Sequence, residues 1–304
     1  MSARFSRRTL SAAMVYFPLV VGVVFTGLGA VYSMEVSQAH QAAILPYYGV
    51  LPFASRDFEA DDVTFEVTSI SLEEGYADCV LTEHVDVHLD GDLMFGVQVP
   101  RRVEGAFFKV VGLDDDKTLE VYYTGDGVVE WDPKGDVSVM WFEFKPESSY
   151  PSFSVEVHFR WLGALSRVGY ASYELAVPFS NSDSDAVLAV RPDARWLGGE
   201  PLVSVRVDLP VDCSVVECIP QAVGESIYWR EWAPGHRSLV LEDGIRFGMP
   251  HGYPLLQSFR MVFEVPGLRE RHDRLVFDSG LFLGVGVQFL LAGVYDAVKM
   301  RNKE

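Results

Sequence analysis

The middle of the chain alternates apolar and polar residues along short runs. Two clear examples are SFSVEVHFRW (residues 152–161) and LVSVRVDL (residues 202–209). A period of two places the apolar side chains on one face of a strand, as in antiparallel sheets that are buried on one side. Turn-forming pairs such as Asp90-Gly91, Asp126-Gly127 and Asp243-Gly244 separate the runs. The pattern predicts an all-β region built from β-sandwiches.

The length of this region favours two sandwiches in tandem. Roughly 210 residues exceed the ~100 residues of one Ig-like sandwich. We expect a first module at residues 63–166 and a second at residues 167–275, joined within the small and polar stretch GALSRVGYAS (163–172). The stretch SNSDSD (180–185) is a competing boundary. Residues 56–166 carry 24 acidic and 8 basic side chains, whereas residues 167–275 carry 15 and 11, so the first module is the more acidic one.

Two long apolar runs flank the β region. No charged residue occurs between Thr9 and Met34 or between Ser279 and Tyr295. About 20 apolar residues cross the hydrocarbon core of a bilayer as a helix, and neither run shows the polar stripe of a surface helix. We therefore predict transmembrane helices at residues 12–34 and 276–298. Residues 1–11 and 299–304 become short basic ends, and residues 35–62 form a connector.

Basic residues predict the orientation of these helices. Three arginines precede the first helix, and the next one along the chain is Arg56. By the positive-inside rule the N-terminus is cytoplasmic, and two spans return the C-terminus to the same side. The basic tail agrees with this orientation (Lys299, Arg301 and Lys303), whereas Arg269, Arg271 and Arg274 argue against it. The β region is then extracytoplasmic, at the cell membrane.

A cleaved export signal is the alternative explanation of the first helix. The motif SRRTL (residues 6–10) resembles the core of a twin-arginine signal. The apolar run is longer than an ordinary signal core, and no A-x-A cleavage site follows it. Retention as an anchor is the favoured interpretation.

Both apolar runs carry small residues at helical spacing. The first run has Gly22, Thr26 and Ala30, and the second has the GxxxG pair Gly280 and Gly284, followed by Gln288. Small residues let helix backbones approach closely, and a mid-helix glutamine needs an interhelical hydrogen bond. These faces predict helix packing, either between the two helices or with partner subunits.

The sequence offers one candidate metal site. On a strand, His84, Asp86 and His88 would project from the same face, about 6.6 Å apart in steps of two residues. A solvated strand face is the simpler interpretation, because no further ligand lies nearby in sequence. No other cofactor is predicted.

The three cysteines leave disulfide formation open. Cys213 and Cys218 could bond if residues 214–217 formed a hairpin loop, but an extended strand would hold them roughly 16 Å apart. Cys79 could equally serve, with the other two, as a small buried hydrophobe.

Charge and motif content narrow the function. A net charge of −18 argues against nucleic acid as a partner, and no catalytic motif is present. Asparagine is scarce and arginine far outnumbers lysine, which is a bias of GC-rich or heat-adapted prokaryotic proteins. We expect a non-enzymatic membrane protein that contacts lipid and other membrane subunits, as an accessory subunit or envelope-assembly factor. A homo-oligomeric two-helix channel or receptor is the alternative, and its ligand is not indicated.

Overall fold

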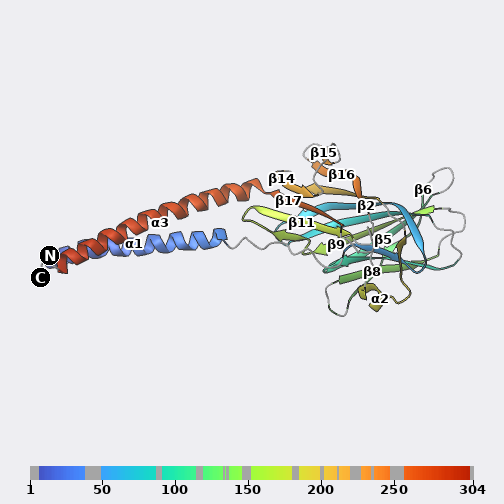
Figure 1. Cartoon of the computed structure of the whole chain (residues 1–304), viewed down its shortest axis with the longest axis horizontal. Helices are drawn as coiled ribbons and strands as arrows, with labels where there is room; N and C mark the ends of the chain where they lie inside the picture. Colours follow the sequence, from blue (N-terminus) through green and yellow to red (C-terminus); the bar gives the residue numbers. More distant parts are fainter. Residues whose placement is uncertain are drawn as a thin grey trace, which may run out of the picture. The chain divides into compact units, whose positions relative to one another are not determined.

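The computed structural model describes residues 7–37, 49–86, 91–113, 119–132, 134, 137–145, 152–179, 185–198, 202–210, 212–219, 227–233, 236–246 and 257–301. Long helices occupy both ends of this range, α1 (Arg7–Ser37) and α3 (Pro266–Arg301), and a short helix α2 (Asp185–Val190) lies between strands (Figure 1). The chain is mostly β-sheet with two apolar helices at its ends.

The strands fall into two groups by position in the chain. The first group precedes residue 166: β1 (Leu51–Ala54), β2 (Phe58–Ser71), β3 (Tyr76–Asp86), β4 (Leu93–Pro100), β5 (Val103–Leu113), β6 (Leu119–Asp126), β7 (Val128–Trp131), β8 (Val137–Phe144) and β9 (Ser152–Leu162). The second group follows: β10 (Leu165–Arg167), β11 (Ser172–Phe179), β12 (Arg195–Gly198), β13 (Leu202–Leu209), β14 (Ser214–Ile219), β15 (Ile227–Ala233), β16 (His236–Arg246) and β17 (Gln257–Glu264).

Hydrogen bonding joins thirteen of these strands into one continuous sheet that contains two runs. One run is β6-β5-β9-β3-β2, which β13, β16 and β15 extend, and another is β12-β1-β4-β8-β7. β12 links the two, since it pairs with β1 antiparallel and with β2 parallel. A separate four-stranded sheet has the order β10-β11-β17-β14.

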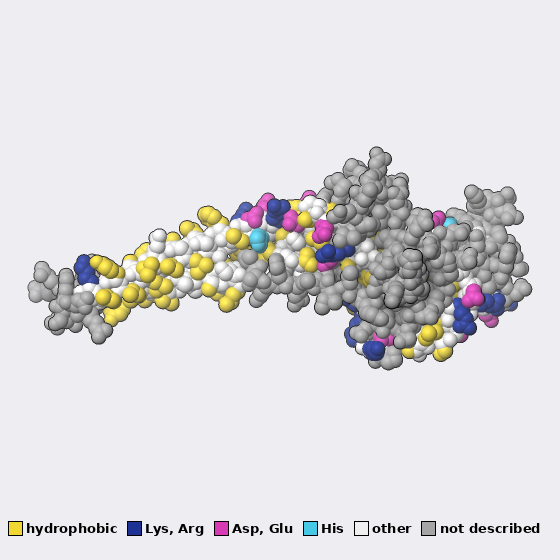
Figure 2. Space-filling view, in the orientation of Figure 1, with side chains coloured by type: hydrophobic (Ala, Val, Ile, Leu, Met, Phe, Trp, Pro, Cys, Tyr) yellow, Lys and Arg dark blue, Asp and Glu magenta, His cyan; other side chains and the backbone are white. Residues whose placement is uncertain are grey.

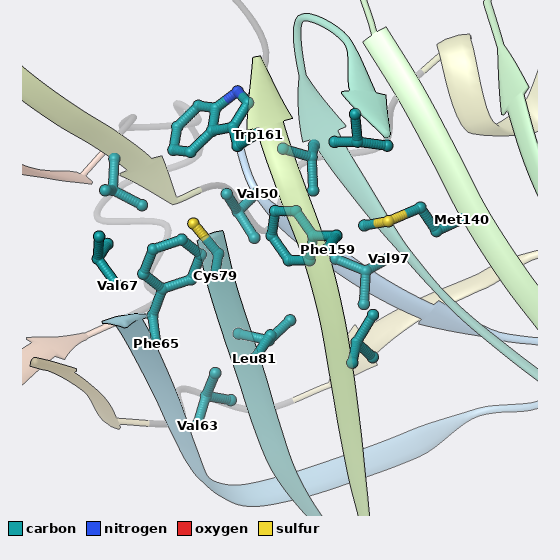
Figure 3. Close-up of a cluster of buried hydrophobic side chains, with 14 of the residues drawn as sticks. Val50, Val63, Phe65, Val67, Cys79, Leu81, Val97, Met140, Phe159 and Trp161 are labelled. Carbon is teal, nitrogen blue, oxygen red and sulfur yellow. The ribbon is translucent and has the colours of Figure 1, made fainter. Parts of the chain in front are cut away.

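Aromatic side chains fill the space between the sheets. Phe108 of β5 packs on Phe142 of β8, with ring centroids 4.4 Å apart, and Phe153 of β9 packs edge-on against Phe144 of β8. Phe65 of β2 does the same against Phe179 of β11. Figure 3 shows this core, where Phe65, Cys79 and Phe159 lie in one cluster with Val97 and Met140. The predicted alternation is therefore confirmed as burial: the apolar positions of both quoted runs line the core.

The predicted division at residue 166 does not divide these sheets. Leu202 to Val207 of β13 pair in parallel with Asp62 to Val67 of β2, although the two strands lie in different predicted modules. The chain instead separates into a β-rich unit (Ala42–Ser166 and Tyr173–Phe263) and a helical unit (Met1–Gln41, Arg167–Ser172 and Glu264–Glu304). Alternation fixes which face a residue occupies but not which strand lies beside it, so it could not distinguish tandem sandwiches from interleaved strands.

Two predicted turn signals have other roles. Asp126-Gly127 joins β6 to β7, where the chain passes from one run to the other and Gly127 N donates to Ala106 O. A Cβ on Gly127 would lie 2.1 Å from the Phe108 ring, so only glycine fits. Asp243-Gly244 lies within β16, where the register with β13 shifts between Val203 and Val205. There glycine marks a bulge rather than a turn.

Candidate functional site

The helical unit carries the most distinctive surface in the structure. α1 has 31 residues and α3 has 36, which correspond to about 46 Å and 54 Å at ~1.5 Å per residue. Tyr16–Met34 and Pro266–Lys299 are each long and apolar enough to cross a membrane. The helices predicted at residues 12–34 and 276–298 thus exist as helices, and each is longer than predicted. The start of α1 and the end of α3 lie at the same end of the helix pair (Figure 1).

Glycines form the contact between α1 and α3. A Cβ built on Gly22 would lie 2.7 Å from Leu290 Cγ, and one on Gly29 would lie 2.6 Å from Leu283 Cγ. On the facing helix, a Cβ on Gly286 would meet the Thr26 backbone at 2.6 Å, and Gly293 is equally close to Leu19. The two backbones are so close that no larger residue fits at these four positions.

Polar and aromatic contacts continue the same antiparallel register. Ser33 Oγ and Ser279 Oγ are 2.9 Å apart and share a hydrogen bond. Phe282 stacks on Phe25 with centroids 5.4 Å apart and also touches Tyr32. Thr26 Oγ1 is buried in the contact without a hydrogen-bond partner. The register is fixed over about four helical turns, from Leu19 to Ser33.

Large apolar side chains cover the outside of the helix pair. Phe277 and Leu291 of α3 are 70% and 66% exposed. Figure 2 shows hydrophobic side chains along this region. The others include Val20, Val23, Val24 and Val31 of α1, and Leu281, Val294 and Val298 of α3. Small residues inside and large apolar residues outside are the reverse of a water-soluble helix pair, and are typical of helices that pack in lipid.

The predicted packing residues divide between two faces. Gly22 and Thr26 lie in the α1–α3 contact, but Ala30 is exposed and Gly29 takes the contact position beside it. Gly280 and Gly284 have nothing within 4 Å of a built Cβ, and together with Gln288 they are exposed. We call Gly280, Gly284 and Gln288 the outer face of α3. The contact is instead marked by glycines seven residues apart, Gly22 and Gly29 on α1 and Gly286 and Gly293 on α3. The prediction considered only small residues four apart and therefore missed this pattern.

The first turns of α3 pack on the segment Arg167–Ser172. Val265 N donates to Ala171 O, and Tyr170 is buried with its ring 5.3 Å from that of His272. Arg167 Nη2 donates to Tyr170 O at 2.6 Å. The stretch 163–172, which was expected to join two sandwiches, is therefore divided: residues 167–172 belong to the helical unit and residues 163–166 to the β-rich unit. Arg269, which argued against the predicted orientation, pairs with Glu264 at 2.9 Å.

The metal candidates are only partly described. His84 is exposed on β3 opposite Ser154 of β9, and Asp86 ends the strand. His88 lies outside the described residues. Within the ranges that the structure describes, no group of three His, Cys, Asp or Glu side chains could hold a metal ion.

All three cysteines are thiols. Ser214–Ile219 is the strand β14, so Cys213 and Cys218 lie along one extended segment instead of facing each other across a hairpin. Burial, together with the charge of Asp212, raises the pKa of the Cys213 thiol to about 11. Burial raises the pKa of the Cys79 thiol well above its usual value.

Comparisons with known proteins assign no activity. The sequence matches no protein-family model and no curated protein. Among solved structures, an M1 zinc metallopeptidase from Deinococcus radiodurans is similar at 11% identity and a TM-score of 0.33, over 69% of this chain and 42% of that one. A candidate nutrient binding protein from Legionella pneumophila is similar at 6% identity and a TM-score of 0.43, over 74% and 72%. The chain spans less than half the length of the peptidase.

Proposed function

We propose that the chain is a non-enzymatic integral membrane protein in which the α1–α3 pair anchors the β-rich unit on the extracytoplasmic side of the cell membrane. Its role is interaction, as an accessory subunit of a membrane complex or an envelope-assembly factor. The observation that carries this proposal is the outer face of α3. It has the composition of a helix–helix interface and is not covered by α1.

The contact that α1 makes with α3 supports its retention as an anchor. A cleaved signal helix has no reason to match a helix near the other end of the chain, yet Gly22, Gly29 and Ser33 each fit a partner on α3. The antiparallel pairing also brings the basic ends together, since Arg7 begins α1 and Arg301 ends α3. Both ends on the cytoplasmic side is the arrangement that the positive-inside rule favours.

Gln288 is the residue on the outer face that most needs a partner. A primary amide in hydrocarbon loses its hydrogen bonds to water, and an interhelical hydrogen bond recovers about 0.6–2 kcal/mol. Gly284 lies one turn before it and Gly280 two turns before it, so a further helix could approach closely enough to reach the amide. A helix of a neighbouring subunit satisfies both requirements.

Native mass spectrometry of the full-length protein, extracted gently from its own membrane, tests this proposal. We expect a heteromeric mass, and we expect Gly284→Leu to release the partner by filling the outer face. Gly27→Leu is the matched control, because a Cβ on Gly27 also meets nothing within 4 Å but lies on α1. A protein that stays monomeric, or a complex that survives Gly284→Leu, would contradict the interaction role of this face.

A homo-oligomeric channel or receptor is the competing function. It needs polar side chains that can face a pore, and away from the ends of the spans the two candidates are Thr26 and Gln288. The Thr26 hydroxyl is buried between α1 and α3, which leaves Gln288 as the exposed one of the two. A clean homotrimer or larger ring in the same mass measurement would favour the channel over the accessory subunit.

A further inference from the structure

Glu83 occupies a core position in the β-rich unit. Along β3 the side chains of Cys79, Leu81 and Val85 are buried, and Glu83 falls in the same alternating series with 1% of its surface exposed. Neither Oε1 nor Oε2 has a hydrogen-bond partner in the structure. A charged carboxylate in such a place is strongly disfavoured, so burial raises the pKa of Glu83 well above its ordinary value and favours the neutral form.

The described side chains that surround Glu83 on the core face are apolar. Its neighbours across the sheet are Val63 of β2 and Val155 of β9. Val63 and Val155 belong to the same hydrophobic cluster as Ala54 of β1, Phe95 of β4 and Phe142 of β8. The charged groups beside Glu83 face outward: His84 and Asp62 are exposed, and Glu156 of β9 pairs with Lys109 of β5 on the outer face.

Glu83 also lies opposite an irregularity in β2. Ala60 pairs with Val85 but the next pair is Val63 with Glu83, so β2 carries one extra residue in the segment that contains Asp61 and Asp62. At the same place β2 changes its other neighbour. Phe58 and Glu59 pair with β12, whereas the pairing with β13 begins at Asp62. This corner, where the two runs of the large sheet are joined through β12, is a place where bulged pairing is weaker than a regular ladder.

We propose that the Glu83 carboxyl is a proton-operated latch on this corner of the sandwich. With the proton bound, the side chain packs among apolar neighbours and the β2–β3 pairing stays closed around the bulge. When the proton leaves to water, the carboxylate draws in solvent and the corner opens locally. The device makes the β-rich unit sense the pH of the compartment that it occupies.

The direction of the pH effect follows from linkage. In the closed state the carboxyl stays protonated, and in the open state it ionises near pH 4.5, as a solvated glutamate does. Above that pH the open state binds fewer protons, so opening is favoured as pH rises. The opening constant approaches a tenfold increase per pH unit until the closed-state pKa is reached. The contribution of Glu83 to stability is therefore greatest in acid and declines toward neutral pH.

Hydrogen–deuterium exchange of the full chain in detergent tests the latch between pH about 5.5 and about 7.5, a range that lies above the pKa of a solvated glutamate. After correction for the intrinsic exchange rate, we expect protection of the peptides that cover residues 58–66 and 80–86 to fall several-fold per pH unit. Glu83→Gln keeps the shape of the neutral acid but cannot ionise. The exchange protection of the same peptides in this variant should therefore not change with pH. Glu104→Gln, at an exposed glutamate of β5, should behave as the unmodified protein.

Two results would overturn the latch. One is protection in the unmodified protein that does not depend on pH at these peptides. The other is a pH dependence that spreads evenly over the whole β-rich unit, because that would report global unfolding. Both are read from the unmodified protein, so the test stands even if Glu83→Gln fails to fold.

Discussion

The position of Cys213 in the β-rich unit lowers the reactivity of its thiol. Its half-buried thiol has a pKa of about 11, so little thiolate, the form that reacts, is present at neutral pH. Cys79 is more deeply buried.

We expect alkylation of Cys213 in the folded protein to accelerate nearly tenfold per pH unit between pH about 7 and 10, since the thiolate fraction rises with pH. Cys79 should remain unlabelled until the protein unfolds. Iodoacetamide labelling followed by peptide mass spectrometry measures both rates. Rapid labelling of Cys79 in the folded protein would contradict its burial in the core.

Gly96 of β4 is a second residue whose identity is fixed by space. A Cβ there would lie 2.4 Å from the Phe53 ring and 2.5 Å from Met140 O. We expect Gly96→Ala to lower the free energy of unfolding by about 1–3 kcal/mol through overpacking. Gly125→Ala in β6 is the control, because its Cβ would make only ordinary contacts at 3.4 Å or more. Urea unfolding compares the two, and equal losses would contradict the close packing at Gly96.

Among the elements, the α1–α3 pair is the one that sequence reasoning predicted only in part. Length and uniform apolarity were enough to predict both helices. The contact face was not evident, because the choice between Gly284 and Gly286 depends on which residues of α1 lie opposite. Gly286 faces Thr26, whereas Gly284 faces nothing on α1. A glycine pattern on one helix describes a possible interface, and only the pair determines which one forms.

We expect Gly286→Leu to separate the helices while Gly284→Leu leaves them together. Ser33 and Ser279 provide the measurement, since their hydroxyls are 2.9 Å apart and the double variant Ser33→Cys with Ser279→Cys should form a disulfide readily. Gly286→Leu in that background should slow crosslinking at least tenfold. If Gly284→Leu slowed it equally, the assignment of the two α3 faces would be reversed.

At the scale of the whole molecule, the sheets interleave strands from distant parts of the chain. The alternation of Val203, Val205 and Val207 correctly predicted a buried face. The partner of that strand, β2, lies about 140 residues earlier. Pairing over such a distance leaves no local trace in a sequence, because backbone hydrogen bonds do not depend on side-chain identity. Glu83 was not singled out from the sequence, and the structure shows that it is buried without a hydrogen-bond partner.

We expect neither predicted module to fold alone. Residues 63–166 lack β13, which leaves one edge of their part of β2 unpaired, and residues 167–275 lose the strand on which β13 forms. Residues 42–263 should unfold in urea in one cooperative transition, whereas each fragment should lack near-ultraviolet circular dichroism. Cooperative unfolding of the 63–166 fragment would contradict this expectation and support the predicted arrangement of two sandwiches in tandem.

The hydrogen bond between Ser33 and Ser279 joins residues 246 positions apart. A ribosome produces chain at about 5–20 residues per second, so α1 exists for roughly 10–50 seconds before its counterpart is made. During that interval the glycine groove of α1 is open to lipid or to any passing helix. Closure of the pair marks the moment when the β-rich unit has been completely synthesised. The helix pair therefore forms only after synthesis has passed the β-rich unit. Until then, the glycine groove of α1 cannot be filled by α3.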